Sequence, residues 1–458
     1  MANSKLSRRH FLAGAASLGA GVVLAACAPK ATPAPAAEQP AEEPAGQAAE
    51  QPAAEPAAQE AVTIRFNART GIQGDHFSER ARAFEQEYPN IKIKEEYFPD
   101  TEYHQKLEVM FAGGTAADTF WTILLSGLYA RYSIHGLVMP IDDLIAADNY
   151  DLSVFYPTVA DAIKVQGASY GLPWVCHPGR IGSFYNKTLY EEAGIELPPA
   201  DGEWNLDDLL PQAKELTRDT DGDGKIDQFG FMPNTETWGI QVWLRSFGSD
   251  LFSEDGTKCI MDSEEGMEAF QFLYDLYHVH KVAPTPEQVI DMMFETGRVA
   301  NYISGYWGIS AKARVGDRFE MGCAPMPKGP AGVMGSMFEF DPICIYSKCQ
   351  HPTEAFEWLN WLANQETGIR IAEVGSVPGA RPDVWESPRL TKEPMHVVWA
   401  NMMANCMPFR GPGNFRGNEI DDAVKQGLGA LWENKGTPKE IVPQVAKSVQ
   451  EILDLSAD

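Results

Sequence analysis

The clearest chemical pattern in the chain is an acidic run at 219–227. Its sequence, Asp-Thr-Asp-Gly-Asp-Gly-Lys-Ile-Asp, places carboxylates at alternate positions and a glycine at the sixth place. This spacing matches the first half of an EF-hand loop, whose oxygen ligands surround a calcium ion. Gly230 stands where such a loop has its closing bidentate acid. We predict a structural Ca²⁺ held by Asp219, Asp221, Asp223, Asp227 and the carbonyl of Lys225, with a solvated Asp/Gly turn as the alternative.

Aromatic and charged side chains give a second pattern. An indole face packs against the C–H patches of a sugar ring, while carboxylates and arginines hydrogen-bond its hydroxyls. Three charged residues are candidates for polar contacts: Arg69 after the first expected strand, Asp118 just before a tryptophan, and Glu339. Of the 11 tryptophans, those expected at strand ends or in loops are Trp121, Trp174, Trp238, Trp243 and Trp307. Core packing is the alternative for each indole, and hydration is the alternative for each charge.

The elements that must position these residues alternate between strand and helix. Apolar residues recur at every second position in the expected strands and at helical spacing in the expected helices. Strand, helix, strand, helix, strand predicts a mostly parallel sheet covered by helices on both faces, with ligands beyond the carboxyl ends of its strands. Strands are expected at 62–66, 91–93 and 118–124, and helices at 77–88, 103–111, 266–280 and 352–363.

The N-terminus carries the pattern of an export signal. Arg8 and Arg9 precede an apolar run at 11–26, which is shorter than the roughly 20 residues that a membrane-spanning helix needs. The paired arginines resemble a twin-arginine signal, and Leu-Ala-Ala-Cys ending at Cys27 resembles a lipobox, in which the cysteine is lipidated. We predict a removed signal at 1–27, an Ala/Pro/Glu tether at 28–60 and a lipid-anchored, extracytoplasmic protein. The alternative is a secreted protein with an incidental cysteine.

Composition limits the partners. The chain has 37 basic and 64 acidic residues, a net charge of −27, which disfavours nucleic acid and anionic lipid headgroups. About 400 residues follow the tether, which predicts two domains; we expect a monomer that requires no cofactor. Six further cysteines lack metal-binding CxxC spacing, and free thiols and one or two disulfides both remain open: Cys176, Cys259, Cys323, Cys344, Cys349 and Cys406.

Several phrases of the sequence, taken together, resemble the extracellular sugar-binding proteins of ABC importers, the family that includes maltose-binding protein. They follow one another in the family's order over nearly the whole chain after the tether. One departure is Tyr306, where the family usually has proline. The matching phrases lie at 84–93, 112–121, 170–174, 184–187 and 297–307.

The resemblance implies an α/β fold of two lobes with a hinge and an interlobe cleft, of the type II periplasmic-binding-protein class. We predict lobe one at 61–182 and 336–378, and lobe two at 183–335 and 379–458. Trp121 and Trp307 fall on positions where the family stacks an indole on its ligand. The implied function is non-catalytic capture of a sugar or oligosaccharide for the membrane subunits of an ABC transporter. A surface glycoside hydrolase, or the same fold binding a polyol or glycerol phosphate, are the alternatives.

Overall fold

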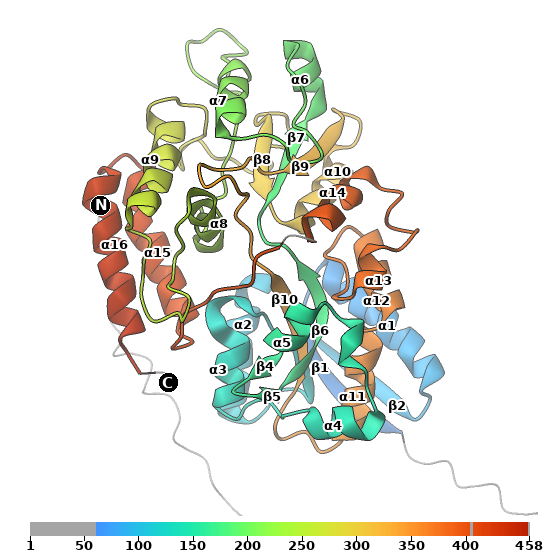
Figure 1. Cartoon of the computed structure of the whole chain (residues 1–458). Helices are drawn as coiled ribbons and strands as arrows, with labels where there is room; N and C mark the ends of the chain where they lie inside the picture. Colours follow the sequence, from blue (N-terminus) through green and yellow to red (C-terminus); the bar gives the residue numbers. More distant parts are fainter. Residues whose placement is uncertain (1–60, 404–405, 457–458) are drawn as a thin grey trace, which may run out of the picture. The chain divides into compact units, whose positions relative to one another are not determined.

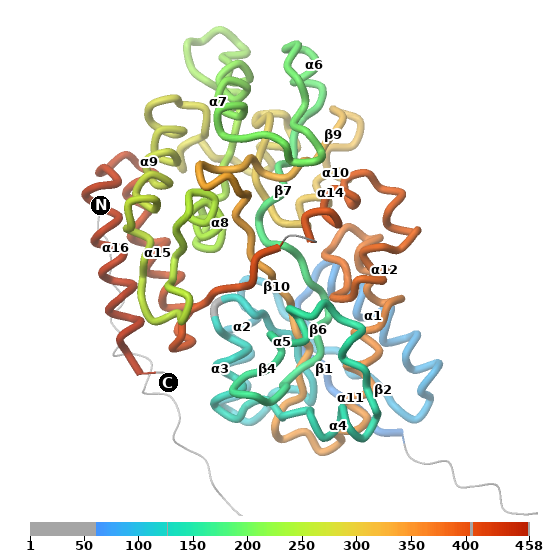
Figure 2. The backbone as a smooth tube through the Cα atoms, in the orientation of Figure 1, coloured from blue at the N-terminus to red at the C-terminus, as the bar shows by residue number. Residues whose placement is uncertain are grey.

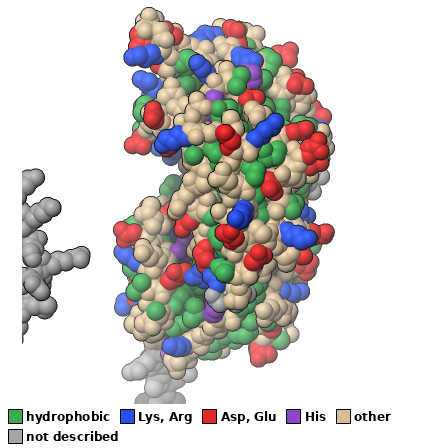
Figure 3. Space-filling model, turned by 90° about the vertical axis from the view of Figure 1, so that its left-hand side faces the viewer, with side chains coloured by type: hydrophobic (Ala, Val, Ile, Leu, Met, Phe, Trp, Pro, Cys, Tyr) green, Lys and Arg blue, Asp and Glu red, His purple; other side chains and the backbone are tan. Residues whose placement is uncertain are grey.

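The structure, a computed structural model, describes residues 61–403 and 406–456. The predicted signal, the tether and Cys27 lie outside this range. In the described part, no helix combines the length and apolarity needed to cross a bilayer. The described chain forms two main β-sheets with helices packed around each (Figure 1). On the face drawn in Figure 3, acidic and basic side chains are interspersed rather than gathered by sign.

The larger sheet has five strands in the order β2-β1-β3-β10-β6. β1 pairs in parallel with β2 and β3, whereas β10 is antiparallel to both β3 and β6. Four of the five strands therefore run in one direction, as the strand–helix alternation predicts. The strands are β1 (Val62–Arg69), β2 (Ile91–Phe98), β3 (Thr119–Trp121), β6 (Gly171–His177) and β10 (Glu339–Ile345), and a separate hairpin joins β4 (Lys164–Val165) to β5 (Ala168–Ser169).

The smaller sheet is antiparallel. β7 (Gly182–Asn186) lies at its centre and pairs with β8 (Asn301–Ser304) and β9 (Met321–Pro325). Its strands are mostly buried on both faces, because helices and loops cover them. Its three strands pair only antiparallel, with one isolated parallel bridge from Met232 to Tyr302 of β8, so the two sheets differ in how their strands connect.

The helices expected at 266–280 and 352–363 are α9 (Glu264–His278) and α11 (Pro352–Leu362), so periodicity found both. α11 and α1 pack on the larger sheet, where Phe66 of β1 meets Phe77 and Trp358 edge to face at centroid distances of 4.9 and 5.6 Å. The other α-helices are α1 (Ile72–Glu87), α2 (Asp100–Gly113), α3 (Leu128–Ile134), α4 (Asp142–Asp148), α5 (Pro157–Ala162), α6 (Lys187–Ala193), α7 (Leu206–Glu215), α8 (Thr237–Phe247), α10 (Ala311–Val315), α12 (Gln365–Glu373), α13 (Pro382–Trp385), α14 (Pro394–Met403), α15 (Gly417–Trp432) and α16 (Pro438–Leu453).

The chain passes between the two sheets more than once (Figure 2). It leaves the larger sheet after β6 and returns to it through β10, and α14, near the end of the chain, packs on β9 of the smaller sheet. All strands of the larger sheet lie within 61–182 and 336–378, and β7 begins at Gly182, the last residue of the first of these ranges. The lobe boundaries to the residue stay a prediction.

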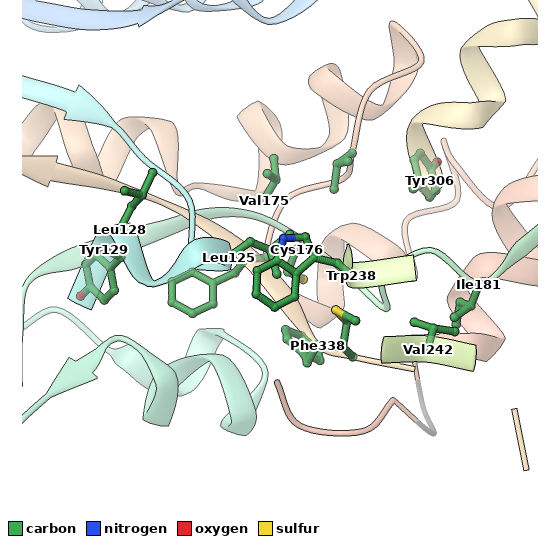
Figure 4. Close-up of a cluster of buried hydrophobic side chains, with 14 of the residues drawn as sticks. Leu125, Leu128, Tyr129, Val175, Cys176, Ile181, Trp238, Val242, Tyr306 and Phe338 are labelled. Atoms are coloured by element: carbon green, nitrogen blue, oxygen red, sulfur yellow. The ribbon is translucent and has the colours of Figure 1, made fainter. Parts of the chain in front are cut away.

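One buried hydrophobic cluster contains side chains of β6, in the larger sheet, and of α8, which lies outside that sheet. Figure 4 draws Val175 and Cys176 of β6 in the same cluster as Trp238 and Val242 of α8. All are at most 5% exposed. The six cysteines of the described chain are all free thiols. Of the two alternatives, free thiols or one or two disulfides, the structure therefore has free thiols.

Candidate functional site

A cleft of about 640 Å³ opens where several strands of the larger sheet end. Arg69 and Trp121 close β1 and β3, His177 closes β6, and Glu339 begins the antiparallel β10, so all four lie at one edge of the sheet. The cleft thus lies where the strand–helix alternation predicted, beyond the carboxyl ends of the parallel strands. Elements outside that sheet add Glu236 before α8, Trp307 and Ser310 in the 3₁₀ segment Tyr306–Ser310, and the loop 375–377 after α12.

Trp121 forms one wall of the cleft, with most of its surface covered. Its side chain is 1% exposed, and the guanidinium of Arg69 lies 4.3 Å from the ring centroid. The indole Nε1 donates to Oδ2 of Asp341 at 3.2 Å. Arg69 in turn donates to Oδ1 of Asp100 at 2.7 Å and to the side chain of Gln73. The ring is therefore fixed by a cation–π contact on its face and a hydrogen bond at its edge.

Trp307 forms the other wall and is open to solvent. It is 37% exposed, and the edge-on ring of His177 lies 5.2 Å from it, centroid to centroid. The guanidinium of Arg180 is also 5.2 Å from the Trp307 centroid. Its benzene ring rests on the backbone of Gly305, where an added Cβ would lie 2.2 Å from ring carbons. The absence of a side chain at Gly305 lets the indole occupy this position.

Arg180 is the central cation of the cleft. Its NH1 donates to Oε1 of Glu339 at 2.9 Å, and its Nε donates to Oε2 of Glu236 at 3.4 Å. Burial alone would lower the pKa of Arg180, but the two carboxylates hold it above its ordinary value. Since Arg69 is paired with Asp100, both guanidiniums of the cleft already have anionic partners.

Burial raises the pKa values of two carboxyls of β10, those of Glu339 and Asp341. Desolvation raises the pKa of Glu339 to about 7, although Arg180 opposes the shift, and raises that of Asp341 to about 6 against the pull of Arg69. Glu339 and Asp341 stand two positions apart on the strand, which places them on one face. Near neutral pH these groups therefore offer both hydrogen-bond donors and acceptors to the cleft.

The cleft histidines are neutral. Burial, with Arg180 adding to it, lowers the pKa of His177 to about 3, and burial with Arg69 lowers that of His104 to about 4. The backbone N–H of Gly179 donates to Nδ1 of His177 at 3.1 Å, so the ring proton is on Nε2. That atom lies 3.5 Å from Oε2 of Glu339 and points a donor toward the carboxyl.

Four of the predicted ligand residues line the cleft: Arg69, Trp121, Trp307 and Glu339. The structure does not bring the other four there. Trp174 is fully buried in the middle of β6, where it packs 4.4 Å from Phe77. The expected strand-end position for Trp174 is wrong because β6 continues to His177.

Trp238 and Trp243 are also not at strand ends, since both lie in α8 and are at most 5% exposed. Trp238 packs near Phe409, and Trp243 near Phe231 and Phe272. A run of apolar residues in α8 buries every one of its side chains, so these indoles fill the core.

Asp118 lies at the wrong end of its strand for the cleft. It precedes β3, whereas Trp121 ends it, and its Oδ2 accepts from the backbone N–H of Arg65 at 2.9 Å. Ten polar cleft residues were not predicted: Thr70, Gln73, Asp100, His104, His177, Arg180, Glu236, Ser310, Asp341 and Ser376. Of these, only Asp341 could have been predicted from its neighbours in the sequence, because it stands two positions from Glu339 in an apolar strand.

The acidic loop lies apart from the cleft. Ligand atoms of Asp219, Asp221 and Asp223 come within 4.8 Å of one another, and all three side chains are exposed. Asp219 accepts from the backbone N–H groups of Gly222 and Gly224 at 2.6 and 2.7 Å, which helps to lower the pKa of its carboxyl. At Gly230 a Cβ would lie 1.9 Å from the carbonyl oxygen of Ala213, so this position has no room for the closing acid.

Comparison with known proteins identifies the class. The family described as bacterial extracellular solute-binding protein matches residues 68–369, and the chain belongs to that family. A putative binding protein of Brucella abortus is 23% identical over 399 residues, 85% of this chain and 91% of that protein. The arabinooligosaccharide-binding protein of Halalkalibacterium halodurans is 26% identical over 263 residues, 54% of each.

Solved structures show the same fold. The ABC substrate-binding protein Lmo0181 of Listeria monocytogenes, in complex with cycloalternan, aligns with a TM-score of 0.77 at 21% identity, covering 86% of this chain and 100% of that one. The predicted two-lobed periplasmic-binding-protein fold is thereby confirmed. The family is one of binding proteins rather than enzymes.

Proposed function

We propose that this protein captures a sugar or oligosaccharide in the cleft and delivers it, chemically unchanged, to the membrane subunits of an ABC importer. The observation that carries the proposal is that Trp121 and Trp307 line one cleft together with several charged side chains. These indoles come from separate parts of the chain, and the charged groups between them suit the hydroxyls of a sugar. The oligosaccharide-binding relatives support the same ligand class.

Binding would close the cleft. Trp121, with Arg69 over its face, belongs to the larger sheet, whereas Trp307 follows β8 of the smaller sheet. A sugar that covers the indole of Trp307 and hydrogen-bonds to the polar groups around Trp121 bridges both. Such a ligand gains contacts in the closed arrangement that the open one lacks, and it therefore shifts the population toward closure. The membrane subunits of the transporter would then recognise the closed arrangement of the binding protein.

The N-terminal sequence supports the location. A lipid on Cys27, followed by the tether at 28–60, would hold the monomeric binding domain outside the membrane. Radioactive palmitate labelling of the wild type and of Cys27→Ala in a bacterial host tests this. Label on the wild type alone supports the anchor, and label on neither contradicts it.

A thermal-shift screen against neutral sugars, confirmed by calorimetry, tests the function itself. A ligand at 100 times its Kd should raise the free energy of unfolding by about 2.7 kcal/mol. The acids of the cleft and their paired guanidiniums favour neutral ligands over phosphates. We therefore expect sugars to stabilise the protein, and polyols or glycerol phosphate to do so less. Stabilisation by glycerol phosphate alone would contradict the proposal.

A glycoside hydrolase is the second candidate, since Glu339 and Asp341 share a strand face, have raised pKa values and lie beside indoles. Against it, Glu339 is engaged by Arg180 and Asp341 by Trp121, which leaves neither free to move toward a glycosidic oxygen. Incubation with each bound oligosaccharide, followed by chromatography, separates the candidates. Cleavage that Glu339→Gln abolishes would establish the hydrolase instead.

A structural Ca²⁺ in the acidic loop is a separate part of the proposal. The three gathered carboxylates support it, and Asp227 is the neighbouring acid of the loop, where it accepts from Thr220. With no acid at Gly230, water would have to complete the coordination, so we expect weak binding.

A further inference from the structure

A second hollow adjoins the cleft at Trp307. It has a volume of about 270 Å³, and Trp307 and Ser310 line both spaces. We call it the annex and define it by Val289, Ile290, Met292, Met293, Phe294 and Tyr302 beside Trp307. The two hollows therefore meet at Trp307, and a molecule that covers this indole in the cleft lies next to the annex.

Part of the annex wall is apolar and open, while Glu295, Ser304, Ser310 and Arg314 line the rest of it. Val289, Ile290 and Met292 are 50%, 51% and 49% exposed. With Trp307 they are four of the eleven large apolar side chains that stay exposed in the described chain. Such a cluster is unusual on a protein with a net charge of −27, because it leaves apolar area in water at about 25 cal/mol per Å².

The backbone of this wall is held in an uncommon conformation. Met292 has a φ of 57°, in the left-handed region that side chains other than glycine rarely adopt. The carbonyl of Met292 accepts from the backbone N–H of Thr296, and also from its hydroxyl at 2.8 Å. The turn that presents Met292 to the annex is thus fixed by hydrogen bonds.

Three of the polar residues that line the annex already have partners, since Arg314 pairs with Glu295 and the hydroxyl of Ser310 donates to the carbonyl of Trp307. Arg314 and Glu295 form an ion pair at 2.6 Å. A sugar ring pushed into the annex would bury hydroxyls against Val289, Ile290 and Met292, and each unpaired hydroxyl costs about 1–3 kcal/mol. An aryl or alkyl group would instead cover these side chains, and the flexible thioether of Met292 adapts to such groups.

We propose that the annex receives an apolar substituent attached to the sugar in the cleft, so that the preferred solutes are glycosides with an aryl or alkyl aglycone. This inference rests on the proposed sugar-binding function. It names the apolar group as a second recognition element beside the sugar.

The test compares two probes, the methyl glycoside and the p-nitrophenyl glycoside of each sugar that stabilises the protein in the screen. Calorimetry should give a Kd about tenfold lower for the p-nitrophenyl glycoside. In the double variant Ile290→Ser and Met292→Asn this difference should disappear, while the Kd of the methyl glycoside stays within about twofold. Asparagine is chosen because it tolerates the left-handed φ of Met292.

Val109→Ser is the matched control, since Val109 is 68% exposed on α2 and outside the annex, and it should keep the tenfold difference. Equal Kd values for the two glycosides of the wild type, with the sugar still bound, would overturn the inference alone. A wild-type dimer in sedimentation that the double variant dissolves would overturn it in favour of a second copy. If no glycoside binds, the proposed function fails first.

Discussion

Each wall of the cleft has a tryptophan, but the two indoles differ in solvent exposure and in what packs against them. Trp121 is 1% exposed and lies under Arg69, whereas Trp307 is 37% exposed and rests on Gly305. Each wall has an arginine near its indole and a carboxyl of β10 nearby. The covered wall is rigid before any ligand arrives, while the open wall keeps a free aromatic surface.

This difference assigns separate tasks to the walls. A fixed, covered indole presents only its edge and the groups around it, so it sets orientation through hydrogen bonds. An exposed indole loses unfavourable contact with water when a sugar covers it, so it contributes more to affinity. The predictions below test this division, beginning with the largest expected effect.

The two carboxyls of β10, Glu339 and Asp341, should make the free energy of unfolding depend on pH over different ranges. A carboxyl whose pKa is raised on folding binds more protons in the folded state, so the free energy of unfolding falls as pH rises through that pKa. For Glu339, with a pKa of about 7, the loss should total about 3 kcal/mol between pH 4.5 and 8. Asp341, with a pKa of about 6, acts mainly below pH 6.

Urea unfolding from pH 6 to 8 measures this effect. His104 and His177, with lowered pKa values, act in the opposite direction as pH falls below about 6.5, inside this window. Because both histidines are present in the wild type and in the variants, the difference between the proteins isolates the carboxyls. Glu339→Gln should remove about 1 kcal/mol of pH dependence there, and Asp341→Asn should remove less. Glu87→Gln, on the exposed part of α1, is the control. Equal slopes in all proteins would refute the assignment.

Removing the open wall should weaken sugar binding about thirtyfold, or by about 2 kcal/mol. We expect this for Trp307→Ala in calorimetry with the best sugar of the screen. Trp361→Ala is a matched control, because Trp361 also packs with an arginine, Arg80 at 4.9 Å, but lies outside the cleft. If both variants lose affinity equally, the open wall has no special role.

A smaller change tests the position of Trp307 alone. Gly305→Ala places a methyl group against the indole and should displace it, for a loss of about fivefold in sugar affinity, or about 1 kcal/mol. The φ of Gly305 is −79°, so alanine fits the backbone. Gly429→Ala in α15, where a Cβ meets nothing within 4 Å, should leave affinity unchanged. An unchanged Kd for Gly305→Ala would show that the ring tolerates displacement.

The acidic loop should give the smallest effect and show that the two walls act locally. Calcium at about tenfold its Kd should raise the melting temperature of chelator-treated protein by about 2 °C, with no change in sugar Kd. Asp223→Asn should abolish the shift, whereas the exposed Asp317→Asn should keep it. No shift in the wild type would remove the calcium proposal and leave the solvated turn.

The sequence predicted much of the fold because its signals are local. Apolar residues at every second or every third to fourth position predicted β1, α1, β2 and α9; the bounds of α9 were right to within two residues, whereas α1 begins earlier, and β1 and β2 run further, than expected. The site was harder to predict. Trp174 and Trp243 have the same residue type as Trp307, and no local pattern distinguishes a buried indole from an exposed one. Arg180 meets Glu236 and Glu339 only across 56 and 159 residues.

What the sequence determined by itself is therefore the α/β alternation, the acidic loop and the supply of indoles and charges, because each depends on neighbours in the chain. The tertiary structure alone decided which indoles face the cleft and which carboxyls are desolvated. Exposure and pKa depend on the atoms that pack around a side chain, and in Trp121, Trp307 and Glu339 those atoms come from distant segments.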